Sequence, residues 1–425
     1  MITETPYCLV LGGGGAKGVY HIGVWQALQE LNIPINAFIG NSIGAIVAAF
    51  LAQGAEDKLL EIAQSMNLNT LIRLSREEAL TDEGSISRHP LKYWQAAYKN
   101  IVERKGLDTT PMRTLLEESL NEDKIRACGF DFGITTVNIS DFKPREVFIE
   151  NMEQNQLINY VMASAAFPGF EQPRIHGKKY MDGGLYDNVP YTMARRRGYR
   201  KIILVDISGI GFSRRPRTEG SQTIHIKNSV EMGNAFDFTP EFIQDFWQLG
   251  YLDTMRVFEQ LIGYEYFLIA NEDLEKTFAN QSHFCSKVDQ LANLFPNDMK
   301  HDKRHVLKIL EVCSKLLKIK QIRKYSYTEL AANIDDALNT IRAKANRFVT
   351  EHELEAEVAP LQLLDAFTQE MIQGKSLIEN PYYYYFLTQK LPENKTAELA
   401  RKYLLKAYPE LKILELYISH MENKL

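Results

Sequence analysis

The sequence predicts an α/β protein with a mostly parallel central sheet, followed by a mainly α-helical C-terminal domain. Short apolar runs alternate with helical stretches in the first part of the chain, as expected for a parallel sheet covered on both faces. Glycine then almost disappears, because 24 of the 25 glycines lie before residue 271 and only Gly374 lies beyond it. We therefore expect two domains, residues 1–270 and residues 271–425.

The expected elements follow one another along the chain. The first strand covers residues 7–11, and a helix follows over residues 19–31. A second strand at residues 37–39 leads into another helical stretch. Further apolar strands are expected at residues 132–137 and 201–207.

The C-terminal domain is predicted to be helical because apolar side chains recur there at helical spacing. These are Val306, Ile309, Leu310, Cys313, Leu316 and Leu317. The same region is basic, with eight Lys and Arg residues between positions 303 and 324 against the single acidic Glu311. A solvated helix face is the simpler explanation of this charge, and contact with an anionic membrane is the alternative. The aromatic run 382–386 is likewise expected to be divided between a core face and a surface face.

Two glycine motifs near the start of the chain predict an acyl-transfer site. They are Gly13-Gly14-Gly15-Ala16-Lys17-Gly18 and Gly40-Asn41-Ser42-Ile43-Gly44. The second has the form of a nucleophile elbow, in which a strand turns sharply into a helix and presents a serine hydroxyl. A run of glycines can turn several backbone N–H groups toward one point, where they stabilise a developing oxyanion. Ser42 is the expected nucleophile, and the first loop is the expected oxyanion hole.

The glycine loop also fits two phosphate-binding patterns, each of which lacks a required residue. Gly13, Gly15 and Gly18 satisfy the dinucleotide-binding pattern. That fold needs an acidic residue about 20 residues further on, where this chain has the serine motif instead. A P-loop needs Ser or Thr after its lysine, whereas Lys17 is followed by Gly18. An ordinary turn would explain either motif alone, and the pairing of the two favours a catalytic site.

A third motif lies far downstream, at residues 177–190, where Asp182 stands between an extended segment and a turn at Gly183-Gly184. An isolated Asp-Gly would be explained as a turn in which the carboxylate binds its own backbone. The order of the three motifs, however, resembles that of the patatin-like phospholipase family. Further similar segments extend the resemblance to about residues 6–260, namely residues 106–108 with 111–116, residues 163–168, and residues 238–241 with 250–254.

The resemblance implies a patatin-like three-layer fold and a Ser-Asp dyad. It assigns Ser42 as the nucleophile, Asp182 as the general base, and Gly13, Gly14 and Gly15 as the oxyanion hole. The supporting motif residues are Lys17, Gly18, Gly40, Gly44, Gly183 and Gly184. Lys17 stands at a position that is commonly basic in the family, and Asn41 stands where a small residue such as threonine is frequent. We expect neither residue to touch the chemistry directly.

A dyad must overcome the low basicity of aspartate. An unperturbed aspartate has a pKa of about 4, so it is a poor base for a serine hydroxyl in water. Burial disfavours the charged form and raises the pKa of a carboxylate, so the dyad needs a dry pocket. A conventional triad is the alternative. Of the nine histidines, only His21 and His176 lie near a motif, and we expect packing for His21 and a surface position for His176.

Composition excludes some functions and leaves others open. The formal net charge of −5 argues against nucleic acid as the main partner. The four cysteines are widely separated and lack metal-ligand spacing, so we expect no metal, no cofactor and reduced, buried thiols. No signal peptide precedes the first strand, and apolar runs such as residues 45–51 are far shorter than the roughly 20 residues that span a bilayer. We expect a cytoplasmic protein that could also bind peripherally at a membrane surface.

The resemblance and the motifs together predict a serine lipid acyl hydrolase of the phospholipase A or lysophospholipase type. Its partner would be a phospholipid or another lipid ester. A general carboxylesterase or thioesterase is the nearest alternative, because the dyad does not choose the leaving group. A second alternative is a binding or scaffolding protein whose C-terminal domain docks a protein partner or self-associates.

Overall fold

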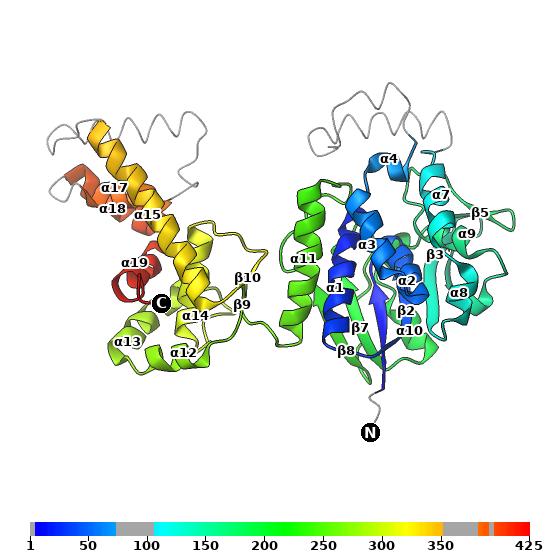
Figure 1. Ribbon diagram of the computed structural model, residues 1–425, viewed down its shortest axis with the longest axis horizontal. Coiled ribbons are helices and arrows are strands. Elements are labelled where there is room, and N and C mark those ends of the chain that lie inside the picture. Colours follow the sequence, from blue (N-terminus) through cyan, green and yellow to red (C-terminus); the bar gives the residue numbers. More distant parts are fainter. Residues whose placement is uncertain (1–4, 74–105, 352–380, 391–394) are drawn as a thin grey trace. The chain divides into compact units, whose positions relative to one another are not determined.

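The computed structural model describes residues 5–73, 106–351, 381–390 and 395–425 (Figure 1). The chain divides into two compact units, Met1–Glu259 and Gln260–Leu425. The boundary expected from the glycine content, at residue 270, falls inside the second unit. Each unit has its own secondary structure and core, described separately below.

An eight-stranded sheet forms the centre of the first unit, in the order β5-β6-β3-β2-β1-β7-β8, with β4 also paired to β3. Its strands are β1 (Tyr7–Leu11), β2 (Ile35–Asn41), β3 (Asp131–Asn138), β4 (Lys143–Phe148), β5 (Arg174–Ile175), β6 (Lys178–Asp182), β7 (Lys201–Asp206) and β8 (Gln222–Lys227). The adjacent strands β3, β2, β1, β7 and β8 run parallel to one another. Strands β4 and β6 each pair antiparallel with β3, and β5 pairs antiparallel with β6. The predicted α/β class with a mostly parallel sheet is confirmed.

Four of the five parallel strands, β1, β2, β3 and β7, lie where the sequence predicted strands. Every residue of β1 is buried, which explains its unbroken apolar sequence. The strands β4 and β8 were not expected, because they have the polar sequences KPREVF and QTIHIK. Only one residue of each is buried, so neither strand has a continuous apolar run for a sequence pattern to detect.

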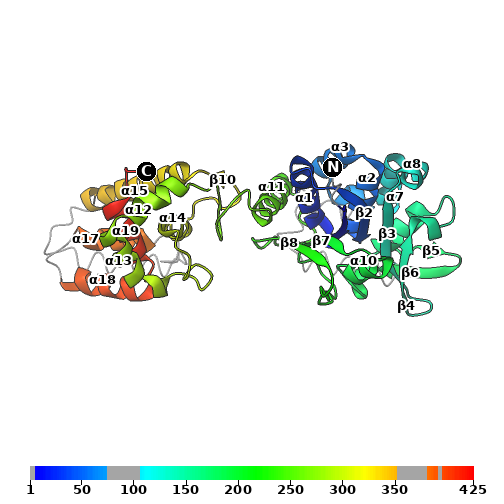
Figure 2. The ribbon, with the colours of Figure 1, turned by 90° about the horizontal axis from the view of Figure 1, so that it is seen from below.

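Helices cover both faces of this sheet. The helices of the first unit are α1 (Val19–Glu30), α2 (Ile43–Gln53), α3 (Glu56–Ser65), α4 (Leu68–Leu71), α7 (Thr110–Ser119), α8 (Glu122–Ala127), α9 (Leu157–Ser164), α10 (Tyr191–Arg197) and α11 (Pro240–Val257), with short 3-10 turns η1 (Gly15–Gly18), η3 (Ile149–Asn151) and η4 (Gly183–Leu185). Figure 2 shows α1, α2 and α3 on one side of the strands and α10 on the other. Tyr191 and Met193 of α10 pack against Cys8 and Val10 of β1, which gives the second face its own apolar layer.

Helices α1 and α11 cross at two glycines. A Cβ atom on Gly23 would lie 2.0 Å from the carbonyl oxygen of Trp247, and one on Gly250 would lie 2.1 Å from that of Tyr20. The backbones therefore touch at this crossing, and neither position has room for a methyl group. Beside the crossing, the Tyr20 hydroxyl donates to the buried carboxylate of Asp253 over 2.9 Å.

We predict that Gly23→Ala lowers the free energy of unfolding of the first unit by about 1–3 kcal/mol, because the added methyl group forces α1 away from α11. Urea denaturation followed by circular dichroism measures the change. Gln29→Ala on the same helix is the control, since Gln29 is exposed and should cost less than about 0.5 kcal/mol. Equal stability of Gly23→Ala and Gln29→Ala would contradict the close crossing.

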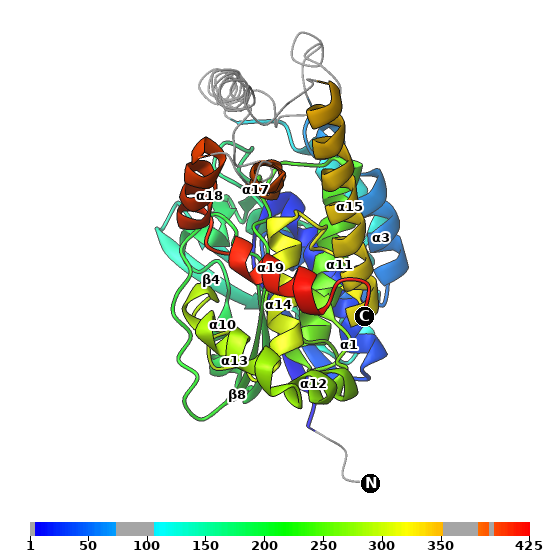
Figure 3. The ribbon, with the colours of Figure 1, turned by 90° about the vertical axis from the view of Figure 1, so that its left-hand side faces the viewer.

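The second unit is mainly helical, as predicted. It contains α12 (Glu272–Ala279), α13 (Ser282–Gln290), α14 (His305–Leu316), α15 (Tyr327–Glu351), α17 (Pro381–Gln389), α18 (Lys395–Ala407) and α19 (Leu411–His420), together with the turn η5 (Ala292–Leu294) and a parallel strand pair, β9 (Phe267–Leu268) and β10 (Lys324–Tyr325). Figure 3 shows α15 and α19 lying against α14. Among the helices that the structure describes, none is both long enough and apolar enough to cross a bilayer.

The core of the second unit contains the side chains that invited functional interpretations. Tyr382, Tyr384 and Tyr385 are buried in this core, so most of the aromatic run is internal. Lys308 of the basic segment is also buried, and its ammonium group lies 5.0 Å from the centre of the Phe295 ring. Lys315 is exposed and forms an ion pair with Glu265. The basic segment is thus divided between the interior and a solvated face.

Candidate active site

Ser42 lies at the turn between β2 and α2, with a backbone conformation that few residues adopt. Its φ and ψ angles are 55° and −126°, and α2 begins at the next residue. Such a conformation costs on the order of 1–3 kcal/mol in a residue with a side chain and persists only where the surroundings impose it. The Ser42 N–H donates to the hydroxyl of Ser164 over 3.0 Å, and the Ser42 carbonyl accepts from Ala45 N over 2.9 Å. The turn is therefore held from both sides.

The two glycines around Ser42 allow the chain to make this turn. A Cβ atom on Gly40 would lie 2.2 Å from the carbonyl oxygen of Gly44. A Cβ atom on Gly44 would in turn lie 2.3 Å from the carbonyl oxygen of Leu11 in β1. Strand and helix can pass this closely only without side chains at both positions, which is the geometry expected of a nucleophile elbow.

The glycine loop lies beside Ser42, but its three glycines make different contacts. The Gly13 N–H donates to the carbonyl of Asn188 over 3.0 Å, so this group is used within the protein. Gly14 and Gly15 line the same pocket as Ser42. Across the part of the chain that the structure describes, neither of their N–H groups donates to a backbone carbonyl. Gly15 also has a φ of 61° and lies against the backbone of Ala235.

Lys17 and Gly18 lie behind the loop. The Lys17 ammonium donates to the carbonyl of Ser208 over 3.3 Å, and Lys17 is not among the residues that line the pocket. Burial lowers the pKa of Lys17, an effect partly opposed by Glu231. A Cβ atom on Gly18 would lie 2.2 Å from the Ile43 side chain, so Gly18 packs against the residue that follows the serine.

Asp182 ends β6 and is almost completely buried. Its side chain is 5% exposed, and its Oδ1 atom accepts from Gly184 N over 2.7 Å. Burial raises the pKa of Asp182 to about 6, and hydrogen bonds from Ser42, Gly184 and Asn41 oppose this rise. The sheet order brings Asp182 to the serine, because in β3 Thr135 is paired with Asn41 and Thr136 with Asp182.

Asn41 contacts the carboxylate, contrary to our expectation that it plays no direct part. Its Nδ2 atom donates to Asp182 Oδ1 over 3.4 Å and to Asn188 Oδ1 over 3.3 Å. Its Oδ1 atom accepts from the Thr135 hydroxyl over 3.1 Å. A Cβ atom on Gly183 would lie 2.3 Å from that same oxygen, so the first glycine after Asp182 makes room for the amide.

Asn188 was not singled out from the sequence, although it connects the Asp182 turn to the glycine loop. Its amide donates to the Gly13 carbonyl over 3.2 Å, and its backbone carbonyl accepts from Gly13 N. Asn41 and Asn188 are both buried, with exposed fractions of 0% and 1%. The only sequence signal was the presence of two amide side chains within the motifs, since a buried amide must find partners.

Neither histidine near the motifs is placed to assist Ser42. His21 Nε2 lies 2.8 Å from the Gly12 carbonyl, and burial lowers the pKa of His21 to about 4, so the ring is neutral and donates to that carbonyl. His176 is largely exposed and lies 3.6 Å from Glu153. Neither residue is among those that line the pocket containing Ser42 and Asp182.

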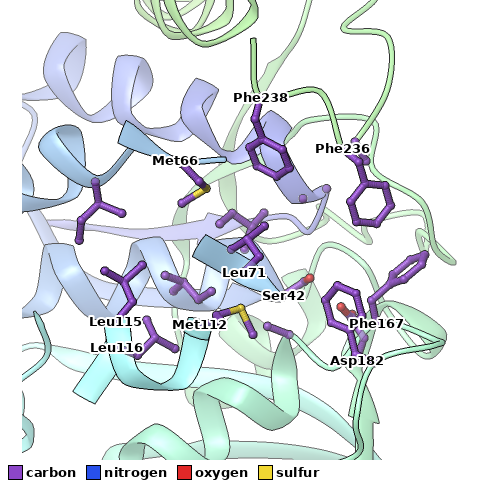
Figure 4. A pocket seen from close by; sticks show the side chains of 18 of the residues that line it. Ser42, Met66, Leu71, Met112, Leu115, Leu116, Phe167, Asp182, Phe236 and Phe238 are labelled. Carbon is purple, nitrogen blue, oxygen red and sulfur yellow. The ribbon is translucent and has the colours of Figure 1, made fainter. Parts of the chain in front are cut away.

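The pocket above Ser42 and Asp182 is a cavity of about 110 Å³ with a mostly apolar wall. Figure 4 shows the two side chains close to one another, with Leu115 and Leu116 farther along the wall. The other apolar residues of the wall include Ile46, Phe50, Leu59, Ile62, Met66, Leu71, Met112, Phe167, Phe236 and Phe238. They come mainly from α2, α3, α4 and α7 and from the segment before α11. Over the described ranges of the chain, no group of three or more His, Cys, Asp or Glu side chains is arranged to hold a metal ion.

A serine at a sharp strand-to-helix turn flanked by glycines, at the carboxyl edge of a mostly parallel sheet, is typical of α/β serine hydrolases. Residues 9–195 match the family model described as Patatin-like phospholipase. The predicted resemblance to the patatin-like phospholipase family is therefore confirmed over these residues.

Two similar proteins illustrate how much of the chain is shared. A Lysophospholipase NTE1 of Cryptococcus neoformans is 31% identical over 204 residues, which are 48% of this chain and 11% of that protein. Patatin-like phospholipase domain-containing protein 6 of Homo sapiens is 25% identical over 214 residues, which are 49% of this chain and 14% of that protein. The chain thus spans only a small part of the length of these curated relatives. Among solved structures, VipD from Legionella pneumophila aligns with a TM-score of 0.38 and 15% identity, covering 98% of this chain and 87% of that one.

We predict that Asp182→Asn makes the protein more stable than the wild type at pH 7. The pKa of Asp182 is about 6 when folded, above the value of about 4 expected when unfolded. Between about pH 4 and pH 6, the Asp182 carboxyl keeps its proton in the folded state but has lost it in the unfolded state. The contribution of Asp182 to the free energy of unfolding therefore falls as the pH rises. The asparagine variant lacks this penalty and should gain about 2 kcal/mol at pH 7 and nothing below pH 4.

Urea denaturation of both proteins across this pH range measures the difference. Asp57→Asn, at an exposed position in α3, is the control for loss of a carboxylate. Parallel pH profiles for the wild type and Asp182→Asn would contradict the raised pKa.

Proposed function

We propose that this chain is a serine lipid acyl hydrolase that cleaves carboxylic ester bonds of phospholipids through an acyl-enzyme on Ser42. The observation that carries this proposal is that Ser42 and the buried Asp182 lie close together in the lining of one mostly apolar pocket (Figure 4). The family model and the lysophospholipase relative support a lipid substrate. The catalytic part is the first unit, Met1–Glu259, and the mainly helical second unit, Gln260–Leu425, is an additional domain.

Asp182 serves as the general base in this proposal. A base works best when its pKa is close to the working pH, and burial brings the pKa of Asp182 to about 6. The partners that oppose this rise are hydrogen-bond donors, and no basic side chain is among them. A neighbouring cation would stabilise the carboxylate and reduce its basicity.

The oxyanion hole is formed by Gly14 and Gly15 rather than by all three expected glycines. Both residues line the pocket that contains Ser42, and within the described residues neither N–H group donates to a backbone carbonyl, whereas the Gly13 N–H is already bound to Asn188. Removing one donor from an oxyanion hole typically lowers kcat by about 100- to 1000-fold, so two well-placed donors make a substantial contribution.

The reaction proceeds in two halves. Ser42 Oγ attacks the ester carbonyl carbon while its proton passes to Asp182, and the resulting oxyanion accepts from Gly14 and Gly15. The intermediate collapses, and the alcohol leaves with the proton from Asp182. Water then attacks the acyl group on Ser42 and gives its proton to Asp182. Release of the fatty acid returns a proton to Ser42.

The wall of the pocket suits the acyl part of a lipid. It consists mainly of Leu, Ile, Met and Phe side chains, whose burial of an acyl chain is favourable by about 0.8 kcal/mol per methylene group. The polar head group would remain outside this wall. We therefore assign the pocket to a single acyl chain adjoining the scissile ester.

We predict that a fluorophosphonate labels the wild type at Ser42, that Ser42→Ala is not labelled, and that Asp182→Asn is labelled at least about 100-fold more slowly. In-gel fluorescence measures labelling, and mass spectrometry of a mixed-phospholipid digest measures hydrolysis. His176→Ala is the control and should behave as the wild type. A folded wild type that resists labelling would contradict the proposal and favour a binding module. Turnover of soluble short-chain esters without hydrolysis of phospholipids would instead indicate a general carboxylesterase or thioesterase.

We further predict that kcat/KM rises with pH up to about pH 6 and is constant above it, because Asp182 must be deprotonated to act as the base. Asn41→Ala should move the midpoint upward by about half a pH unit or more, since the lost hydrogen bond had lowered the pKa of Asp182. Thr135→Val is the matched control. It removes a partner of Asn41 but leaves the contact between Asn41 and Asp182, so its midpoint should stay closer to that of the wild type. An unchanged midpoint in Asn41→Ala would rule out the positioning role of the amide.

A further inference from the structure

The loop after β7, residues 207–221, exposes large apolar side chains beside the pocket. Ile210 is 64% exposed and Phe212 is 71% exposed, although both are of a type that a soluble domain usually buries. Leu185, in the turn after Asp182, is 42% exposed. A scattered exposed apolar residue needs no explanation, but these three lie on adjoining backbone segments.

Backbone contacts hold this loop against the Asp182 turn. The Phe212 N–H donates to the Gly184 carbonyl over 2.9 Å, and the Asn188 N–H donates to the Phe212 carbonyl over 2.7 Å. A Cβ atom on Gly211 would lie 2.8 Å from the Gly184 carbonyl oxygen, so the two backbones are in direct contact. The exposed side chains are therefore presented by an anchored backbone.

The same loop reaches the mouth of the pocket. Ile210 is one of the residues that line the pocket that contains Ser42, yet most of its own surface faces solvent. Ile210 thus belongs to both the pocket wall and the outer surface. A ligand or surface that binds Ile210 and Phe212 from the solvent side would therefore lie at the entrance to the pocket that contains Ser42.

Basic residues follow the apolar ones directly. Arg214 lies over the ring of Tyr186, with its guanidinium carbon 3.9 Å from the ring centre, which fixes its position. Arg215 and Arg217 are exposed. Within the described residues, neither of these two forms an ion pair. Their charges are therefore available to an external anion.

We propose that residues 207–217, together with Leu185, form a docking surface for an anionic lipid surface. Apolar side chains beside exposed arginines match a membrane interface, where acyl chains lie beneath anionic head groups. The exposed arginines favour an anionic occupant, and a fluid lipid surface can adapt its shape to the exposed apolar side chains. This inference rests on the proposed function, because the docked lipid surface would supply the phospholipid substrate. The docking surface takes the place of the C-terminal basic segment as the element proposed to contact a membrane.

Binding is tested separately from hydrolysis by sedimentation of the full chain with phosphatidylcholine vesicles, with and without phosphatidylglycerol. The Ser42→Ala background keeps the lipid intact. Phe212→Ser should weaken binding to the anionic vesicles by about tenfold, because burial of a phenylalanine side chain contributes that much. Arg215→Glu combined with Arg217→Glu should weaken it by at least about fivefold and reduce its dependence on salt.

The matched control is Phe130→Ser. Phe130 is 38% exposed and precedes β3, at the opposite edge of the sheet from Ser42. Leu185→Ser provides a second apolar variant, and circular dichroism checks that each variant is folded. In the active protein, Phe212→Ser should lower hydrolysis of vesicle lipid while leaving hydrolysis of a soluble short-chain ester unchanged.

Equal vesicle binding by Phe212→Ser and Phe130→Ser would overturn the docking surface. So would binding that is unaffected by phosphatidylglycerol, or a loss of self-association in Phe212→Ser without loss of vesicle binding, which would indicate a protein interface. Absence of hydrolysis with intact, Phe212-dependent vesicle binding would overturn the proposed enzyme function and leave the docking surface standing.

Discussion

The site depends on the burial of one carboxylate. Asp182 is 5% exposed, and burial raises its pKa because water no longer solvates the charge. Its partners are the Ser42 hydroxyl, the Gly184 N–H and the Asn41 amide, all of them neutral donors. These hydrogen bonds stabilise the buried carboxylate, but they do not lower its pKa to that of a solvated aspartate. Burial of Asp182 thus lowers the stability of the protein at neutral pH, and under the proposed function it gives Ser42 a base of raised pKa.

The sheet is what brings the groups together. Asn41 ends β2 and Asp182 ends β6, and both strands pair with β3 at neighbouring residues, Thr135 and Thr136. The glycine loop follows β1, and β1 pairs with β2 on the side of β2 opposite β3. Three segments far apart in the sequence therefore meet at one edge of the sheet, and Asn188 joins the Asp182 turn to the loop. The pocket wall comes from helices on the same side, which keeps water away from the carboxylate.

Much of this arrangement could be predicted from the sequence, because glycines and apolar runs carry the information. Gly40 and Gly44 signal a close crossing of strand and helix, and the apolar residues of β1 signal a buried parallel strand. The contacts of Asn41 could not be predicted, since a side-chain amide gives no sign in sequence of which partners it will find. The use of the Gly13 N–H by Asn188 was hidden for the same reason. Both are long-range contacts, which depend on the packing of the whole sheet edge. The polar strands β4 and β8 were missed because they lack an apolar pattern.

The most direct test of this account is a ¹³C NMR titration of the Asp182 carboxyl carbon in the full-length protein, assigned by its loss in Asp182→Asn. The account predicts a midpoint near pH 6, because burial outweighs the three hydrogen bonds. A midpoint near 4, the value of a solvated aspartate, would contradict it. The carboxylate would then be too weakly basic to deprotonate Ser42 in the way proposed.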